Sequence, residues 1–77
     1  MKNEIKNIFI NEFGISETDL NSNKTLSDMG VDSIVIIEIQ FELESQFNIK
    51  IPDGDISSTF TLSDFESYIA GAVEVHA

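Results

Sequence analysis

Three runs of residues repeat their apolar positions at three- and four-residue steps, and polar stretches separate them. The first run, residues 3–13, carries Ile5, Ile8, Phe9 and Phe13 in one stripe, with mostly charged and amide side chains elsewhere. Because every third or fourth position of a helix falls on the same face, this spacing predicts an amphipathic helix. Gly14 follows directly and fits the end of that helix, where a positive φ is common.

The second run, residues 34–47, is the most apolar part of the chain. Its β-branched start and its alternating acids and glutamines would also fit a strand. Its length exceeds that of an ordinary strand and its apolar residues recur at helical steps, so we predict a helix. Asp32 or Ser33 is expected to cap it. The expected core residues of this helix are Ile37, Ile39, Leu43 and Phe47.

The third run begins at Thr61, which can form a capping box with Asp64. Its apolar stripe consists of Leu62, Phe65, Tyr68, Ile69, Ala72 and Val73. This stripe predicts a last helix that ends near Val73, with residues 74–77 as a frayed tail.

The polar stretches predict connections with isolated anchors. Residues 15–31 form a long loop, with one helical turn expected at residues 16–19, and its apolar members Leu20, Leu26, Met29 and Val31 are expected to pin it to the core. Pro52 and the pair Asp53-Gly54 predict a break. Residues 56–60 fit either a brief helix or an irregular loop.

Together these elements predict an all-α fold. We expect a small four-helix bundle with a long first loop. It would consist of three main helices and a short additional helix, which is third in chain order and precedes the last one. Residues 1–77 are expected to form a single domain, because the chain has room for one small core and shows no repeat.

Composition narrows the classes of partner. Fourteen acidic residues against four lysines give a formal net charge of −10, which repels nucleic acid and anionic membranes. This charge favours basic protein surfaces as partners, with solubility of a small domain as the alternative explanation. The chain has no cysteine, no apolar leader and no run of membrane-spanning length. We therefore expect a cytoplasmic protein.

Ser33 is the candidate for chemistry, and it has two interpretations. An Asp-Ser pair before an apolar run is most often only a helix cap. A phosphate joined to the Ser33 oxygen would also be stabilised there, since the first turn of a helix offers free N–H groups and a positive partial charge. Gly30 before it permits a tight turn.

Catalytic and metal-binding alternatives fit the sequence poorly. A serine hydrolase needs a base, and the one histidine, His76, lies in the expected tail. A calcium loop starting at Asp53 would have Ser58 where glycine is needed and would lack its final glutamate. We expect neither catalytic nor metal-binding residues.

Over nearly its whole length the chain resembles the acyl carrier proteins. The residues that carry the likeness are Leu26-Ser27-Asp28-Met29-Gly30-Val31-Asp32-Ser33-Ile34, Glu38, Leu43-Glu44, Phe47, Ile49-Lys50-Ile51-Pro52, Thr61-Leu62 and Tyr68-Ile69. The resemblance implies that Ser33 is esterified by 4′-phosphopantetheine, which a separate phosphopantetheinyl transferase takes from coenzyme A. The thiol of this arm would carry acyl groups as thioesters, and the protein itself would be a monomer that catalyses nothing.

The resemblance also implies partners and their docking surface. These would be an acyltransferase, a ketosynthase and other acyl-processing enzymes with basic docking patches. The implied recognition residues are Asp32, Ile34, Val35, Glu38, Phe41 and Glu42, although core packing remains an equal alternative for Ile34, Val35 and Phe41. Ile56, Thr59 and Phe60 are candidates for contact with the acyl chain or the arm, with simple core packing as the alternative.

Two departures from the family pattern bear on the pathway. Ile34 stands where the family usually has leucine, and Val35 stands where carriers of fatty-acid synthesis commonly have an acid. A recognition helix with less ionic character favours polyketide assembly over fatty-acid biosynthesis. The alternative from another class is an unmodified acidic helical adaptor that binds a basic protein partner.

Overall fold

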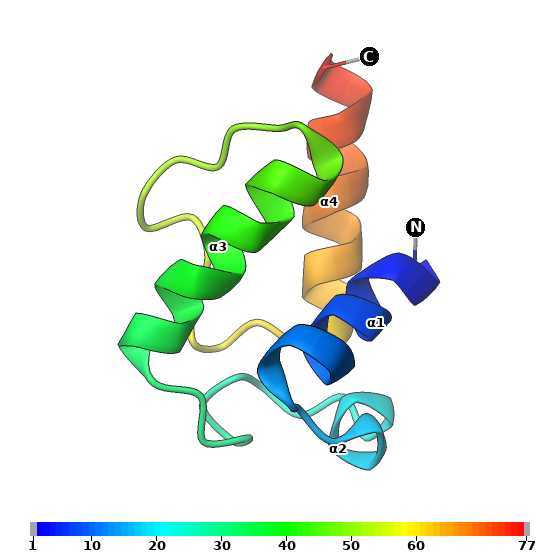
Figure 1. Cartoon of the computed structure of the whole chain (residues 1–77), viewed down its shortest axis with the longest axis vertical. Coiled ribbons are helices and arrows are strands. Elements are labelled where there is room, and N and C mark those ends of the chain that lie inside the picture. Colours follow the sequence, from blue (N-terminus) through cyan, green and yellow to red (C-terminus); the bar gives the residue numbers. More distant parts are fainter. Residues whose placement is uncertain (1, 77) are drawn as a thin grey trace.

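The computed structural model describes the backbone of residues 2–76 and the side chains of residues 3–73. Within this part of the chain there are four helices and no strand: α1 (Lys2–Phe13), α2 (Glu17–Asn21), α3 (Ser33–Phe47) and α4 (Leu62–His76). Helices α1, α3 and α4 pack around a common core, and short α2 lies below them (Figure 1). The predicted all-α fold with a small helical bundle is confirmed.

The core combines one face from each long helix with anchors from the loops. The Phe65 ring lies at its centre, edge-on to Phe9 and Phe60 with ring centroids 4.9 and 5.1 Å away. Leu20 and Leu26 are buried, and Met29 and Val31 pack against the core, so the predicted pinning of the first loop is confirmed. The buried apolar residues are Ile5, Ile8, Phe9, Leu20, Leu26, Ile39, Leu43, Ile49, Ile51, Ile56, Phe65 and Ile69.

The first helix ends as the sequence predicts. Gly14 has φ +66°, and its N–H donates to the Ile10 carbonyl at 3.1 Å. A residue with a side chain is strained at such a φ, so glycine suits this position. The helical turn expected at residues 16–19 is present as α2, which Ser16 caps by accepting the Asp19 N–H at 3.5 Å.

On α3 the choice of buried face differs in part from the prediction. Ile39 and Leu43 are buried and Phe47 packs against the core, as expected, but Ile37 is 50% exposed, so its core assignment was wrong. Gln40 takes an inward position instead and is only 6% exposed. Because α3 is apolar on nearly every side, its sequence pattern could not select a single buried face.

The short third helix expected before the last helix is not formed, and of the two alternatives for residues 56–60 the irregular loop is confirmed. This part of the α3–α4 loop (residues 48–61) consists of turns, and the short helix of the bundle is α2. Side chains satisfy backbone N–H groups of this loop: Glu44 Oε2 accepts from Ile51 at 2.7 Å, and Ser57 Oγ accepts from Thr59 at 3.1 Å. The break at Pro52 is confirmed by a turn in which Gly54 has φ +89°.

The last helix begins with the predicted capping box. Thr61 N–H donates to Asp64 Oδ2 at 3.0 Å, and Asp64 N–H donates to Thr61 Oγ1 at 3.2 Å. The helix continues to His76, so the prediction of a frayed tail is wrong for residues 74–76. No proline follows Val73 to stop it, and Ala77 lies outside the described residues.

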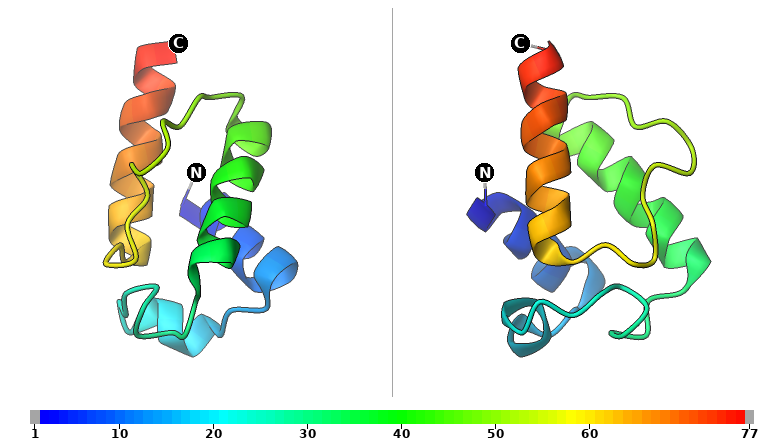
Figure 2. Two further views of the ribbon diagram at one scale, coloured as in Figure 1. Left: turned by 90° about the vertical axis from the view of Figure 1, so that its left-hand side faces the viewer. Right: turned by 180° about the vertical axis from the view of Figure 1, so that it is seen from behind.

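Backbone bonds join the α2–α3 loop (residues 22–32) to the α3–α4 loop. Leu26 N–H donates to the Phe60 carbonyl at 3.0 Å, and Ser27 N–H donates to the Ser58 carbonyl at 2.9 Å. Both loops therefore meet at the end of the bundle where α3 starts, as the turned views in Figure 2 show. Among residues 2–76, no helix combines the length and apolar character needed to cross a membrane.

Candidate functional site

Ser33 is the first residue of α3, and Asp32 caps that helix. Asp32 is extended, with φ −87° and ψ 174°, and its Oδ1 accepts the Val35 N–H at 3.0 Å. The cap is therefore supplied by Asp32, one of the two predicted candidates. Ser33 is exposed, and no hydrogen bond within the described part of the chain engages its hydroxyl.

The turn that leads into α3 fixes the position of this serine. Gly30 has φ +76°, with its N–H donating to the Ser27 carbonyl at 3.1 Å, and Val31 N–H donates to the Leu26 carbonyl at 3.0 Å. A β-carbon on Gly30 would meet nothing within 4 Å, so the backbone conformation, not space, favours glycine there. Because Val31 packs against the core, the start of α3 is anchored on the side away from solvent.

The electrostatics at Ser33 suit an anion on its oxygen. The N–H groups of Ser33 and Ile34 precede the first intrahelical bond and have no acceptor within the described residues. They add to the positive partial charge at the start of this helix. The carboxylate of Asp32 opposes that charge in part, while its cap holds the turn in place.

Most of the expected recognition residues lie at the surface. Asp32 and Glu38 are exposed, Glu42 is half-buried, and Val35 is half-buried against the core. Ile34 is 69% and Phe41 60% exposed, which removes the core alternative for both.

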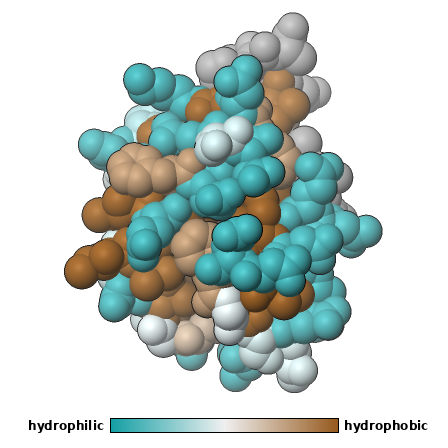
Figure 3. Space-filling view, viewed as in Figure 1, coloured by the Kyte–Doolittle hydropathy of each residue, from teal (hydrophilic) through white to brown (hydrophobic). Residues whose placement is uncertain are grey.

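The sequence reasoning missed Ile37, whose position completes a stripe with Ile34 and Phe41 at steps of three and four residues. We call these three residues the apolar stripe of α3. Apolar side chains gather at the left edge of the molecule in Figure 3, on the side of α3. No sequence signal distinguished Ile37 from the buried isoleucines, because all of them lie in one apolar run.

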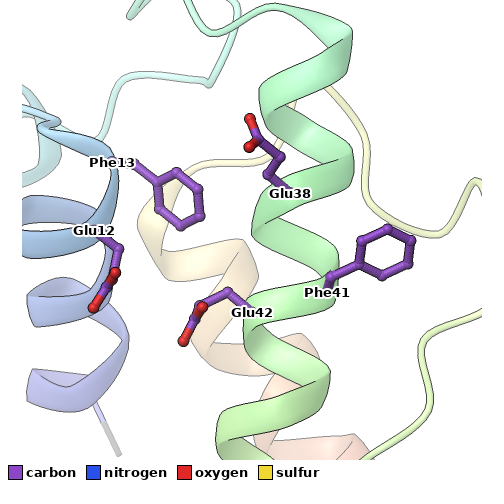
Figure 4. Close-up of a pocket in the computed structure, with 5 residues that line it drawn as sticks. All are labelled: Glu12, Phe13, Glu38, Phe41 and Glu42. Carbon is purple, nitrogen blue, oxygen red and sulfur yellow. The ribbon is translucent and has the colours of Figure 1, made fainter.

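A hollow of about 410 Å³ lies between α1 and α3. Figure 4 shows the Phe13 ring pointing from α1 toward α3, with the Glu38 and Glu42 side chains on the facing side. The lining residues are Glu12, Phe13, Glu38, Phe41 and Glu42. Neither α1 residue was predicted as part of a site, because their proximity to α3 arises only from the packing of the two helices.

The candidates for acyl or arm contact have different surroundings. Ile56 is buried in the core, and Phe60 is half-buried with its ring against Phe65 and Tyr68. Thr59 is exposed, and its hydroxyl lies 2.8 Å from that of Ser57. Core packing accounts for Ile56 and Phe60, and contact with an acyl chain or arm stays a prediction.

Two further candidates for chemistry were a metal ion and His76. No group of three or more His, Cys, Asp or Glu side chains there is arranged to hold a metal ion. The side chain of His76 lies outside the described side chains.

A small helical bundle that presents a free serine at the start of a long helix is a suitable scaffold for a covalently attached group. Residues 3–69 match the protein family described as phosphopantetheine attachment site, and the chain belongs to this family. The resemblance found in the sequence is thereby confirmed, and with it 4′-phosphopantetheine as the cofactor.

Three curated relatives that match most of the chain carry the name acyl carrier protein. The chain is 30% identical to that of Thermotoga maritima over 67 residues, which cover 86% of this chain and 83% of the relative. It is 28% identical to the acyl carrier protein of Campylobacter fetus, over 88% of this chain and 90% of the relative. It is 29% identical to that of Clostridium acetobutylicum over 72 residues, with 92% and 94% covered. No solved structure matches the chain.

Proposed function

We propose that the chain is an acyl carrier whose Ser33 oxygen is the attachment point of 4′-phosphopantetheine. The observation that carries the proposal is the free, exposed Ser33 hydroxyl, which Asp32 releases from the role of helix cap. When bound, the arm supplies a thiol that holds acyl groups as thioesters, in a chain that has no cysteine of its own.

The residues around Ser33 have separate roles in this function. The Ser33 and Ile34 N–H groups stabilise the negative charge of a phosphodiester. Asp32 and Gly30 hold the turn, so that the hydroxyl points to solvent where a transferase can approach. The chain presents an attached group and leaves catalysis to its partners, as a carrier does; tethering raises the local concentration of that group at each partner.

The partner enzymes are proposed to bind along α3. The exposure of most of the recognition residues supports this role. These residues are Asp32, Ile34, Val35, Glu38, Phe41 and Glu42. Ile37 joins them as a member of the apolar stripe. Helix α3 carries three glutamates and no lysine or arginine, so a basic patch on the partner fits it.

The partners are a phosphopantetheinyl transferase, an acyltransferase, a ketosynthase and related acyl-processing enzymes, and the carrier works as a cytoplasmic monomer of one domain. We favour polyketide assembly over fatty-acid biosynthesis, because the apolar stripe and Val35 give the recognition surface less ionic character. Turnover of the loaded carrier by enzymes of each system tests this preference. Equal or better turnover by fatty-acid synthase enzymes would contradict it.

Contact of the arm or acyl chain with Ile56, Thr59 and Phe60 forms part of the same proposal. Its support is the pair of backbone bonds that hold residues 58 and 60 against the loop leading to Ser33. Nuclear magnetic resonance shifts at these three residues on loading with an acyl arm would support it, and unchanged shifts would contradict it.

The test of the attachment site is intact-mass measurement after incubation of the apo-chain with coenzyme A, Mg²⁺ and a broad-specificity transferase. We expect a mass gain of one arm that disappears in Ser33→Ala. Ser45→Ala is the matched control, since Ser45 is exposed on the same helix. No gain with several transferases would favour the alternative, an unmodified acidic adaptor for a basic protein.

A further inference from the structure

Two consecutive residues connect the α3–α4 loop to the turn that leads to Ser33. Leu26 N–H donates to the Phe60 carbonyl at 3.0 Å. Ser27 N–H donates to the Ser58 carbonyl at 2.9 Å. Both bonds join backbone groups of segments that are about thirty residues apart in the chain, so the loop holds this part of the preceding connection directly.

The carbonyl groups of the same two residues hold the turn before α3. The Leu26 carbonyl accepts the N–H groups of Met29 and Val31 at 3.1 and 3.0 Å. The Ser27 carbonyl accepts the Gly30 N–H at 3.1 Å. One short segment therefore bonds to the α3–α4 loop through its N–H groups and to the turn through its carbonyl groups.

The α3–α4 loop has no helix of its own, and a few side-chain bonds fix it to the long helices. Gln40 of α3 donates to the Ile51 carbonyl at 3.1 Å, and Glu44 accepts the N–H of the same residue at 2.7 Å. Tyr68 of α4 donates to Asp55 Oδ2 at 2.7 Å. Segments held by few bonds open at a lower free energy than the core of a protein, and they open as cooperative units.

Helix α1 packs on a different side of α3 from this loop. Glu42 of α3 faces Glu12 and Phe13 of α1 across the hollow, whereas Gln40 and Glu44 bond to the loop. The loop and α1 accordingly lie on opposite sides of α3 in Figures 1 and 2. Release of the loop therefore leaves the packing of α1 on α3 in place.

We propose that the α3–α4 loop and the attachment turn, which we define as residues 26–32, open and close as one unit, separately from the three long helices. The bonds of Leu26 and Ser27 carry a change in the loop to the turn and, by linkage, a change in the turn to the loop in equal measure. This coupling goes beyond the carrier function, since it holds whatever Ser33 carries.

The coupling has a consequence for Ser33 that rests on the proposed carrier function. Gln40 and Tyr68 become positioning residues for the attachment site, because they hold the loop and the loop holds the attachment turn. A partner enzyme that binds the α3–α4 loop therefore also changes how firmly the turn before the attached group is ordered.

Native-state hydrogen exchange of the ¹⁵N-labelled apo-chain, followed by nuclear magnetic resonance, tests the coupling. The reporters are Ile51 N–H in the loop and the N–H groups of Leu26 and Ser27 in the attachment turn. Gln40→Leu removes the donor to the Ile51 carbonyl. It should speed exchange of all three reporters by one common factor of about 5 to 150.

Ile8→Val is the matched control, because Ile8 is buried on α1, across α3 from the loop. This variant should speed exchange only of amides that open with the whole chain, by a factor of about 2 to 12. The Leu26 and Ser27 reporters should not respond to it. Their acceleration by both variants would mean that they open only with the whole chain, and no response to Gln40→Leu would mean that the turn opens without the loop; either result overturns the proposal.

Tyr68→Phe repeats the test from α4. It removes the bond to Asp55 and should again speed exchange of Leu26 and Ser27 by the same factor as Ile51. It keeps the ring that packs near Phe60, so it provides the answer if Gln40→Leu does not fold. Acceleration confined to the loop would contradict the coupling.

The exchange experiment and the Ser33 loading assay fail independently. Joint opening without loading of Ser33 would support the coupled unit and overturn the carrier function. Loading of Ser33 without joint opening would overturn the coupling, and with it the positioning role of Gln40 and Tyr68.

Discussion

The Tyr68 hydroxyl donates a hydrogen bond of 2.7 Å to Asp55 Oδ2 and so ties the α3–α4 loop to α4. Burial raises the pKa of Tyr68 to about 12, and the bond to Asp55 and the negative charges of Asp55 and Glu44 act in the same direction. Gln40 and Glu44 fasten the same loop to α3, so side chains from two helices hold a segment that has no helix of its own.

This bond predicts a loss of stability at high pH. Because the folded pKa of Tyr68 is raised, the stabilising contribution is full below pH 10, the ordinary pKa, and is lost as the pH rises toward 12. Tyr68→Phe should lose this part of the pH dependence and about 1 kcal/mol at pH 7. Urea unfolding of both proteins at pH 7 and pH 11 checks it. Both proteins contain the same lysines, so any effect of lysine titration cancels in the comparison. An identical decline in stability in the two proteins would contradict the role of Tyr68.

Gln40 is expected to be the more critical of the loop's attachments. Its Nε2 donates to the Ile51 carbonyl at 3.1 Å and to Asp53 Oδ1 at 3.2 Å from a buried position. Gln40→Leu leaves the Ile51 carbonyl without this donor and should lower the free energy of unfolding by about 1–3 kcal/mol. Gln46→Leu, at an exposed position, should change it by less than about 0.5 kcal/mol in urea unfolding. Similar losses in both would mean that the loop is held by other contacts.

The two faces of α3 should respond differently to truncation. Ile39→Ala removes a fully buried side chain and should lower the free energy of unfolding by about 2–5 kcal/mol. Ile37→Ala should change it by less than about 1 kcal/mol, since that side chain is half exposed, but should weaken docking of partner enzymes. Urea unfolding and partner titration separate the two effects. A large loss of stability in Ile37→Ala would contradict the apolar stripe.

Alanine substitutions at two glycines should have opposite effects on stability. Gly30→Ala places a side chain at φ +76° and should destabilise the turn before Ser33 by about 1–2 kcal/mol. Gly71→Ala lies inside α4 with open space around it and should stabilise the chain by about 0.5–1 kcal/mol. Thermal unfolding checks both signs, and stabilisation by Gly30→Ala would show that the turn differs from the one described.

Helix capping at the attachment site can be separated from charge. Asp32→Ala removes the acceptor for the Val35 N–H and should lower the free energy of unfolding by about 1 kcal/mol. Asp32→Asn keeps an oxygen acceptor and should lose much less, while it removes the same charge. Urea unfolding of the two variants distinguishes the capping hydrogen bond from the charge. Equal losses of unfolding free energy in both variants would assign the effect to the charge.

Local features of this protein followed from the sequence alone. The helices at α1, α3 and α4, the end at Gly14 and the capping box of Thr61 and Asp64 depend on residues within a turn or two of one another. Spacing, side-chain type and φ preference specify such features directly. The same local logic identified Ser33 as the candidate for chemistry and Asp32 as one of the two possible caps of α3.

Tertiary structure alone decided which side of α3 is buried and what surrounds it. Residues 34–47 are apolar on almost all sides, so the outward position of Ile37 and the inward position of Gln40 depend on how α1, α4 and the α3–α4 loop pack around that helix. Residues 53–60 form turns after Pro52, and side chains from two distant helices bond to them: Gln40 of α3 to Asp53 and Tyr68 of α4 to Asp55. The hollow joins Phe13 to Glu38 across the gap between two helices. Contacts between residues so far apart in sequence leave no periodic signal, and only packing brings them together.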